Sequence, residues 1–334
     1  MTRTLVTGAS GLLGRAVLEA FEAKGDEVKG TAYSRAGGSL AKASRSLGTL
    51  VIDGSRPMTL QRSCGLQLDL QDDEAVASLF NDFKPDVVIH CAAERRPDAV
   101  EANSAAVEKL NVGVPRLLST LSRSSDYPFF LIYISTDYVF DGHAPPTGYE
   151  PNDATGPTNA YGESKLAGEK AILAGLKEGG KGCVLRVPVL YGKVESNGES
   201  AINVLVDSVR KAAEGTPVKM DNWAARNPTC TRDIGRVLRD LAVKSQASDA
   251  EIPAILHFSA QEMFTKYDMA HIFARVHQPP LEVRDNLVRV DEGPKPGETI
   301  RPKDCHLSNR AIEALGIDTR TVKFEQWWQE YLKA

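Results

Sequence analysis

A glycine-rich stretch near the start of the sequence constrains the fold of this chain more than any other feature. Residues 4–6 form a short apolar run, and the TGxxGxxG pattern of residues 7–14 follows directly. Gly8 permits a tight turn off a strand, Gly11 lets backbone amides approach a pyrophosphate, and Gly14 lets a helix pack closely on a sheet. Apolar residues then recur at the spacing of one helical face. The order strand, glycine turn and helix favours a dinucleotide-binding unit over an ordinary strand-to-helix turn.

Length and composition limit the class of protein. At 334 residues the chain is large for a single core, so we expect two lobes. The formal net charge of -4, from 40 basic and 44 acidic residues, argues against nucleic-acid binding. The five cysteines contain no CxxC pair, which argues against a disulfide framework and a zinc or other metal site. An early first strand leaves no room for a signal peptide, and no apolar run has membrane-spanning length, so the sequence predicts a cytoplasmic protein with no membrane partner.

The end of the second predicted strand, residues 27–32, indicates which nicotinamide cofactor binds. An NAD site has an acidic residue about 20 positions beyond the glycines, where its carboxylate bonds the ribose 2′-hydroxyl. This chain has Tyr33, Ser34 and Arg35 there instead. The guanidinium of Arg35 suits a 2′-phosphate, which a carboxylate would repel. The sequence therefore favours NADP(H), with a solvated surface arginine as the alternative.

Residues 37–64 interrupt the dinucleotide-binding unit. They are rich in Gly and Ser, carry four basic residues and one acidic residue, and show no sustained periodicity. We predict an inserted loop that either closes over the adenosine phosphate or, as the favoured alternative, lies on the surface. A strand resumes at residues 66–68, and by analogy with such folds Asp69 and Leu70 at its end contact the adenine ring.

Two further apolar runs, residues 86–90 and 129–134, are typical of buried parallel strands. The small residues at 91–93 after the first run would let the backbone approach the cofactor. His90, at the end of an apolar strand, is interpreted as a core histidine. A helix is predicted from about residue 98 to about residue 121.

The residues that suit catalysis lie between positions 135 and 165. Thr136 stands at the carboxyl end of a predicted strand, which faces the crevice where ligands bind, and would hold the substrate oxygen. Tyr161 and Lys165 stand at i and i+4 of a predicted helix, so both project from one face. Lys165 and a positive nicotinamide ring would lower the pKa of Tyr161 from its usual value of about 10. Thr136, Tyr161 and Lys165 are the predicted catalytic residues, with a structural tyrosine and a solvated lysine as the alternative.

Together these motifs resemble the extended short-chain dehydrogenases and reductases, in particular those related to dTDP-4-dehydrorhamnose reductase. The shared runs are ISTDYVFDG at residues 134–142, YGESKLAGEKA at residues 161–171, and Arg301-Pro302. Several other segments resemble the regulatory β subunits of methionine adenosyltransferase, which are relatives of that reductase: residues 90–98, 130–142, 189–192, 227–229 and 265–267. The similarity runs from Arg3 to about Ile317 and is interrupted mainly by the 37–64 insertion.

The resemblance implies an α/β fold with a Rossmann-type, doubly wound parallel sheet. An NADP-binding domain would span residues 1–190, and a smaller C-terminal substrate-binding lobe would span residues 191–334. The resemblance also adds cofactor contacts to those that the glycine pattern and the small residues predict. The full predicted set is Gly8, Ser10, Gly11, Leu12, Leu13, Gly14, Tyr33, Ser34, Arg35, Asp69, Leu70, Cys91, Ala92, Ala93, Arg95, Tyr161, Lys165 and Leu190. Asn111 matches a proton-relay residue of these reductases, and a buried polar tie to helix backbone is an equally good interpretation.

Two functions from different classes follow. The first is an NADP(H)-binding regulatory subunit that associates with a catalytic methionine adenosyltransferase in S-adenosylmethionine synthesis. The second is an active NADPH-dependent carbonyl reductase acting on a ketone or 4-keto sugar nucleotide, with Tyr161 as proton donor. Val189 replaces an aromatic residue of the sugar reductases, which weighs against their deoxysugar substrate.

The sequence stops at Ala334 without the extended tail of the β subunits. We therefore expect contact with a catalytic subunit through the nucleotide-binding lobe, or through Trp327 and Trp328 as an exposed anchor. The alternative for these two residues is a final amphipathic helix docked on the core.

Overall fold

The computed structural model describes residues 2–33, 65–95, 100, 104–124, 126–249, 251–295 and 297–333. The predicted cofactor contacts Ser34 and Arg35 and the predicted inserted loop 37–64 lie outside these ranges.

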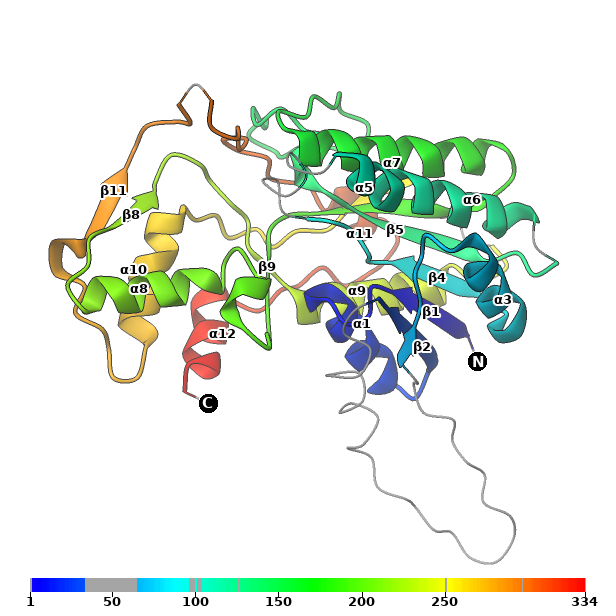
Figure 1. Cartoon of the computed structure of the whole chain (residues 1–334), viewed down its shortest axis with the longest axis horizontal. Helices are drawn as coiled ribbons and strands as arrows, with labels where there is room; N and C mark the ends of the chain where they lie inside the picture. The colour runs from blue at the N-terminus through cyan, green and yellow to red at the C-terminus, as the bar shows by residue number, and fades with distance from the viewer. Residues whose placement is uncertain are drawn as a thin grey trace, which may run out of the picture.

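A seven-stranded parallel sheet forms the centre of the structure, in the order β10-β6-β5-β4-β1-β2-β3 (Figure 1). The strand order reverses at β1, which pairs with β2 on one side and β4 on the other. This is the doubly wound arrangement that the sequence predicts. The strands are β1 (Arg3–Thr7), β2 (Glu27–Ala32), β3 (Gly65–Gln67), β4 (Val87–His90), β5 (Phe130–Thr136), β6 (Lys181–Val187) and β10 (Ile255–His257).

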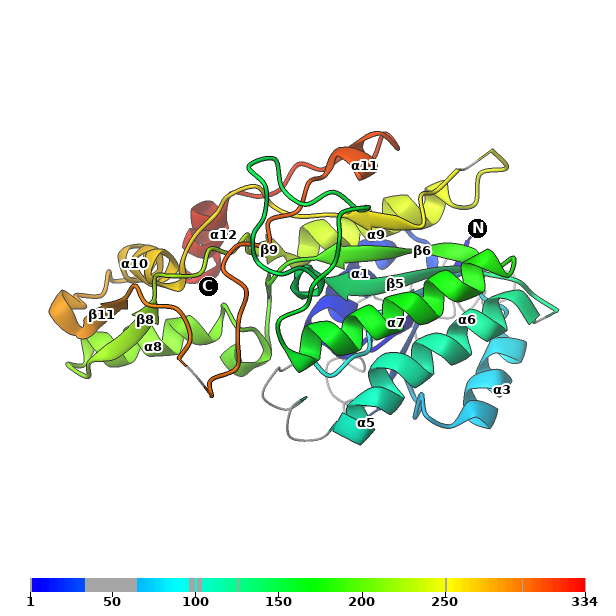
Figure 2. The same ribbon diagram turned by 90° about the horizontal axis from the view of Figure 1, so that it is seen from above.

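Helices cover both faces of this sheet (Figures 1 and 2). On one face, α1 (Leu12–Glu22) and α9 (Thr231–Lys244) share a core with the strands, with Val17 and Leu238 fully buried. On the other face, α3 (Asp73–Phe83), α6 (Val114–Ser124) and α7 (Ala160–Lys177) form a second cluster with the strands. Continuous apolar strands such as β4 are required because helices exclude water from both sides.

In the glycine turn between β1 and α1, Gly8 has the tight-turn role that the sequence predicts, while Gly14 lies against the turn itself. Gly8 has a φ of +69°, and a Cβ on it would lie 2.7 Å from the backbone N of Ala92. A Cβ on Gly14 would lie 2.3 Å from the backbone O of Gly8. A side chain at either position would force the turn, the helix or β4 to move.

The helix predicted over residues 98–121 is interrupted. The described part consists of α5 (Ser104–Glu108), a π-helical turn η1 (Lys109–Gly113) and α6. A π-helical turn adds a residue to one turn and changes the direction in which its side chains point. Asn111, in this turn, is thereby directed towards the loop after β4 and towards α7, as its hydrogen bonds show.

A separate hydrophobic cluster, which we call the second core, lies beyond the carboxyl ends of the sheet strands. It includes Tyr191, Phe273, Phe324, Trp327 and Trp328, packed as a group of contacting rings. Its main elements are β7 (Leu190–Tyr191), α8 (Val204–Ala213), β8 (Val218–Asp221), β9 (Thr229–Cys230), α10 (Lys266–Val276), β11 (Leu287–Val290) and α12 (Phe324–Tyr331). Trp328 is fully buried and Trp327 nearly so, which confirms the docked helix and makes the expectation of an exposed tryptophan anchor wrong.

The chain passes between the central sheet and the second core more than once. Both α9 and β10 follow residue 190 in sequence, but α9 packs beside α1 on one face of the central sheet and β10 is a strand of that sheet. A single boundary at residue 190 stays a prediction. The remaining elements are the short turns η2 (Asp137–Val139), η3 (Asn197–Glu199) and η4 (Arg284–Asn286), and α11 (Arg310–Glu313). Within the described ranges, no helix has both the length and the apolar composition needed to cross a membrane.

Candidate functional site

A cavity of about 490 Å³ lies at the carboxyl ends of the parallel strands, beside the second core. It is lined by every predicted site residue that the structure describes: Gly8, Ser10, Gly11, Leu12, Leu13, Gly14, Tyr33, Asp69, Leu70, Cys91, Ala92, Ala93, Arg95, Thr136, Tyr161, Lys165 and Leu190. Ligands of open α/β sheets bind at this edge, where the strand order reverses. The sequence prediction and the topology therefore point to the same place.

The glycine turn forms the end of the cavity that suits a dinucleotide. Gly11 is the N-cap of α1, and it has no side chain that would accept hydrogen bonds from the first amides of the helix. Those amides lie at the positive end of the helix dipole and need an acceptor. A pyrophosphate group is negatively charged and accepts hydrogen bonds, so it suits both the helix dipole and these amides. Tyr33 and Asp69 line the cavity beyond β2 and β3, on the side where the adenosine half would lie.

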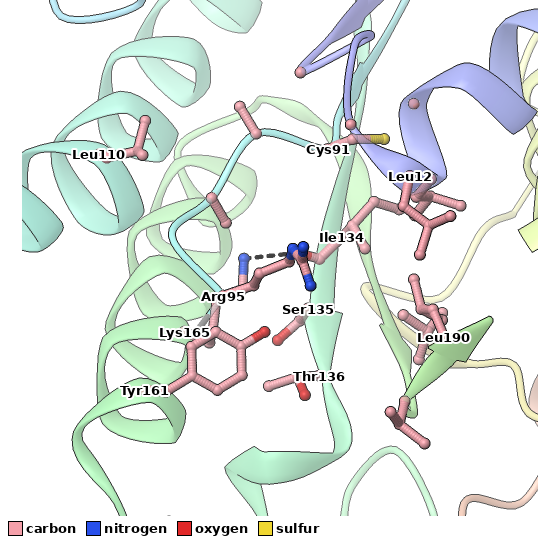
Figure 3. Close-up of a pocket in the computed structure, with 18 of the residues that line it drawn as sticks. Leu12, Cys91, Arg95, Leu110, Ile134, Ser135, Thr136, Tyr161, Lys165 and Leu190 are labelled. Carbon is pink, nitrogen blue, oxygen red and sulfur yellow. Dashed lines mark hydrogen bonds between the residues drawn. The ribbon is translucent and has the colours of Figure 1, made fainter. Parts of the chain in front are cut away.

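Thr136, Tyr161 and Lys165 come together in the cavity (Figure 3). Thr136 is the last residue of β5, while the other two are one turn apart at the start of α7. Asn159 caps this helix, since its side chain accepts a hydrogen bond from the Gly162 amide over 3.0 Å. Fixing the first turn in this way fixes the direction of Tyr161. The spacing read from the sequence thus produces the predicted juxtaposition.

Burial determines the charge states of these groups. It lowers the pKa of Lys165 to about 7, against the opposing effects of Glu169 and Cys91. The Lys165 ammonium donates to the Ile134 carbonyl over 2.8 Å. Burial also raises the pKa of Tyr161 above its ordinary value, and a hydrogen bond with Thr136 offsets this only in part. Lys165 alone therefore does not lower the pKa of Tyr161, and the phenol is neutral.

Asp137 is a cavity residue that the sequence reasoning missed. It directly follows Thr136, whose hydroxyl donates to Asp137 Oδ1 over 3.0 Å, and it is buried. Burial raises its pKa to about 7, while the hydrogen bond from Thr136 and the charge of Arg226 act in the opposite direction. Its place inside the run ISTDYVFDG was the available signal, but spacing alone does not show that its carboxylate is buried.

Basic residues from three separate segments also line the cavity: Arg226, Lys266 and Arg301. The Arg226 side chain is 5% exposed and its Nη1 donates to the carbonyls of Ala225 and Pro302. Among the described residues its Nη2 has no hydrogen-bond partner, and the nearest carboxylate oxygen, on Asp221, is 3.7 Å away. No local pattern in the sequence links these three segments.

Asn111 holds the site together through backbone contacts. Its side chain accepts from the Glu94 amide and donates to the Glu94 carbonyl, each over 3.0 Å. It also donates to Ser164 Oγ over 3.0 Å, so the loop that carries Arg95 is tied to α7. This geometry favours the structural interpretation of Asn111. His90 is likewise a core residue, fully buried with Nδ1 2.6 Å from Thr7 Oγ1.

Comparison with known proteins places this geometry in a family. Residues 2–334 match the RmlD substrate binding domain. The chain belongs to this family. Methionine adenosyltransferase 2 subunit beta of Danio rerio is 38% identical over 323 residues, which cover 97% of this chain and 88% of that protein. The protein of the same name from Rattus norvegicus is 40% identical over 320 residues, covering 96% and 84% of the two chains.

Solved structures of dTDP-4-dehydrorhamnose reductases share the fold of this family member. The protein from Clostridium acetobutylicum superposes with a TM-score of 0.73 at 25% identity, covering 99% of this chain and 98% of the other. The protein from Bacillus anthracis, in complex with NADP, gives a TM-score of 0.73 at 21% identity, covering 100% and 98%. The predicted relationship to both the reductases and the β subunits is therefore confirmed.

Proposed function

We propose that this chain is an NADP(H)-binding regulatory subunit, located in the cytoplasm, that associates with a catalytic methionine adenosyltransferase in S-adenosylmethionine synthesis. The observation that carries the proposal is the identity of 38 to 40% with proteins named methionine adenosyltransferase 2 subunit beta, over nearly the whole chain. Identity at this level extends through both cores and not only through the glycine turn. It therefore supports a shared binding role in addition to a shared fold.

The residues around the cavity fit the proposed cofactor. The uncapped amides at the start of α1 would hold the pyrophosphate, and Cys91, Ala92 and Ala93 leave room for backbone to approach the cofactor. Tyr161 and Lys165 would hold the nicotinamide ribose, a role that does not require turnover. An intact set of these residues is thus compatible with a protein that binds NADP(H) for regulation.

The second candidate function is an NADPH-dependent carbonyl reductase, favoured by the convergence of Thr136, Tyr161 and Lys165 in the cavity. When bound, NADPH supplies a hydride to a carbonyl carbon. Tyr161 would donate its phenolic proton to the carbonyl oxygen, which the Thr136 hydroxyl would hold in place. Lys165 would stabilise the phenolate that remains. The substrate class is a ketone or a 4-keto sugar nucleotide.

The partner is the first point to test. The chain and the catalytic methionine adenosyltransferase of its own organism are expected to form a complex at micromolar concentration, measured by mass photometry. NADP should strengthen the association if it binds best to the conformation that contacts the catalytic subunit, because it then increases the population of that conformation. Bovine serum albumin in place of the catalytic subunit is the negative control. Absence of a complex with and without NADP would contradict the regulatory proposal and leave the reductase as the better one.

The preference between the two nicotinamide cofactors depends on Arg35, which lies outside the described residues. NADPH is expected to bind at least about tenfold tighter than NADH, or about 1.4 kcal/mol, because the guanidinium pairs with the 2′-phosphate. Arg35→Asp should remove or reverse this preference, as measured by calorimetric titration. Arg284→Asp makes the same charge change at an exposed position that does not line the cavity and serves as the control. Equal affinities in the wild type, or an unchanged preference in Arg35→Asp, would show that Arg35 does not select the cofactor.

A further inference from the structure

A buried ion pair joins the glycine turn to a segment beside the second core. Arg15, in the first turns of α1, donates from Nη2 to Glu199 Oε2 over 2.5 Å. The same guanidinium donates from Nη1 to the Ser10 carbonyl over 2.6 Å. The two residues are 184 positions apart, and their side chains are only 14% and 10% exposed. A charge-assisted pair in such a site is screened by salt much less than a surface pair.

Glu199 belongs to residues 195–203, which we call the strap. Ala201 and Ile202 of the strap line the cavity, so this segment forms part of the cavity wall. The strap contains the short turn η3, and the Glu195 amide donates to Glu199 Oε2 over 3.2 Å. The carboxylate that pairs with Arg15 therefore also organises the backbone of the strap.

Hydrogen bonds fasten the other side of the strap to the strand β7. The Ser200 hydroxyl donates to the carbonyl of Leu190, a predicted cofactor contact, over 2.7 Å. The Asn203 side chain donates to the Gly192 carbonyl over 3.0 Å. The strap thus connects two walls of the cavity: β7 through these hydrogen bonds, and the glycine turn through Arg15. Of these connections, only the one to the glycine turn depends on a pair of opposite charges.

We propose that Arg15 and Glu199 are positioning residues that clamp the strap onto the glycine turn, and that the clamped state is the one that binds the dinucleotide. The inference rests on the proposed NADP(H) binding. Arg15 holds the Ser10 carbonyl and therefore the turn whose amides face the pyrophosphate, while Glu199 fixes the position of Arg15. Loss of either charge frees the strap to leave the cavity wall. The fraction of molecules in the clamped state then falls, and the apparent affinity for the dinucleotide falls with it.

The clamp and simple electrostatics predict opposite effects of one substitution. Glu199→Gln removes a negative charge near the place where a dinucleotide pyrophosphate would lie. Direct Coulomb repulsion between the carboxylate and the phosphates would make NADP bind tighter to this variant. Loss of the clamp makes NADP bind more weakly. The sign of the change in affinity therefore separates the two explanations.

Hydrogen exchange and calorimetry on the full chain test the proposal. In the absence of cofactor, backbone amides of the strap are expected to exchange about tenfold faster in Glu199→Gln than in the wild type. Glu195→Gln makes the same change at an exposed position of the same strap and should exchange as the wild type does. In calorimetric titration, Glu199→Gln is expected to bind NADP about tenfold more weakly, which corresponds to about 1.4 kcal/mol.

The two measurements separate failure of the clamp from failure of the proposed function. Strap exchange in cofactor-free Glu199→Gln equal to that of the wild type would overturn the clamp whatever NADP does. Faster exchange with unchanged or tighter NADP binding would overturn the link between the clamp and affinity. A wild type that binds no NADP would overturn the proposed cofactor role, while the cofactor-free exchange rates would still decide whether Arg15 and Glu199 hold the strap.

Discussion

Tyr161→Phe is expected to slow NADPH oxidation by any ketone that the wild type accepts about 1,000-fold, and to change NADP affinity by less than about threefold. The substitution removes the phenolic proton and keeps the ring that lines the cavity. The neighbouring groups do not replace this donor easily. The Lys165 ammonium donates one hydrogen bond to the Ile134 carbonyl, and the Thr136 hydroxyl must turn from Asp137 before it can contact a substrate oxygen.

The burial of Tyr161 strengthens this expectation for the reductive direction. Because burial raises its pKa, the phenol is protonated throughout the physiological pH range and ready to donate. A variant that lacks the Tyr161 hydroxyl loses one contact to the nicotinamide ribose, but Lys165 and the amides at the start of α1 would still hold the cofactor and Thr136 the ketone. The loss should therefore fall on kcat and leave the cofactor dissociation constant nearly unchanged.

Absorbance of NADPH in the presence of ketones and 4-keto sugar nucleotides gives the rate, and calorimetry gives the affinity. Tyr127→Phe makes the same chemical change at a half-exposed position near the amino end of β5, away from the cavity, and should behave as the wild type. Turnover that survives in Tyr161→Phe would show that another group is the acid. No turnover in the wild type across the whole screen would favour the regulatory proposal.

Much of this fold could be predicted from sequence because its decisive signals are local. The strands of a covered parallel sheet are short apolar runs, so residues 86–90 and 129–134 are recognisable without any partner. The glycine pattern spans only eight residues, although the space that Gly8 leaves is filled by the distant Ala92, and only Gly14 lies against the turn itself. Tyr161 and Lys165 were recognisable because i and i+4 share a helical face.

The features that could not be predicted depend on contacts between distant segments. Nothing in the sequence of α9 indicates that it packs against α1, because the chain enters the second core before it reaches α9. The π-helical turn brings Asn111 into hydrogen bonds with Glu94 and Ser164, which lie on other elements and give no local signal. Arg226 is a cavity residue only because two other segments enclose it. The predicted roles of the cavity residues stay predictions until a ligand is measured.

A buried charged network behind the cavity engages the hydroxyl of Ser135, the neighbour of Thr136 on β5. Glu169 accepts the Ser135 hydroxyl and two parallel hydrogen bonds from Arg186, over 2.9 and 2.7 Å. The remaining Nη1 of Arg186 donates to the Pro151 carbonyl over 3.2 Å. These bonds join β5, β6, α7 and the connection between β5 and α7. The network therefore supports the two elements that carry Thr136 and Tyr161.

Arg186→Met is expected to lower the free energy of unfolding by about 3–5 kcal/mol, because it leaves the buried Glu169 carboxylate without its paired guanidinium, with Lys165 as the remaining cationic neighbour. The Arg186 and Glu169 side chains are 3% and 1% exposed, so water cannot replace the lost donors. For a domain with a typical total stability of about 5–15 kcal/mol, this is a large fraction. The shift in the midpoint of urea unfolding measures the change, provided that the slope of the unfolding free energy with urea concentration is the same in both proteins.

Two further variants separate charge burial from the loss of an arginine as such. Arg275→Met breaks a 2.9 Å ion pair with Glu325 whose side chains are 59% and 48% exposed, and should cost less than about 1 kcal/mol. Adding Glu169→Gln to Arg186→Met removes the uncompensated charge but keeps an acceptor for Ser135, and should recover more than half of the loss. If Arg186→Met destabilises the protein no more than Arg275→Met does, the network does not support the site energetically. If the double variant is no more stable than Arg186→Met, the loss arises from packing and not from the buried carboxylate.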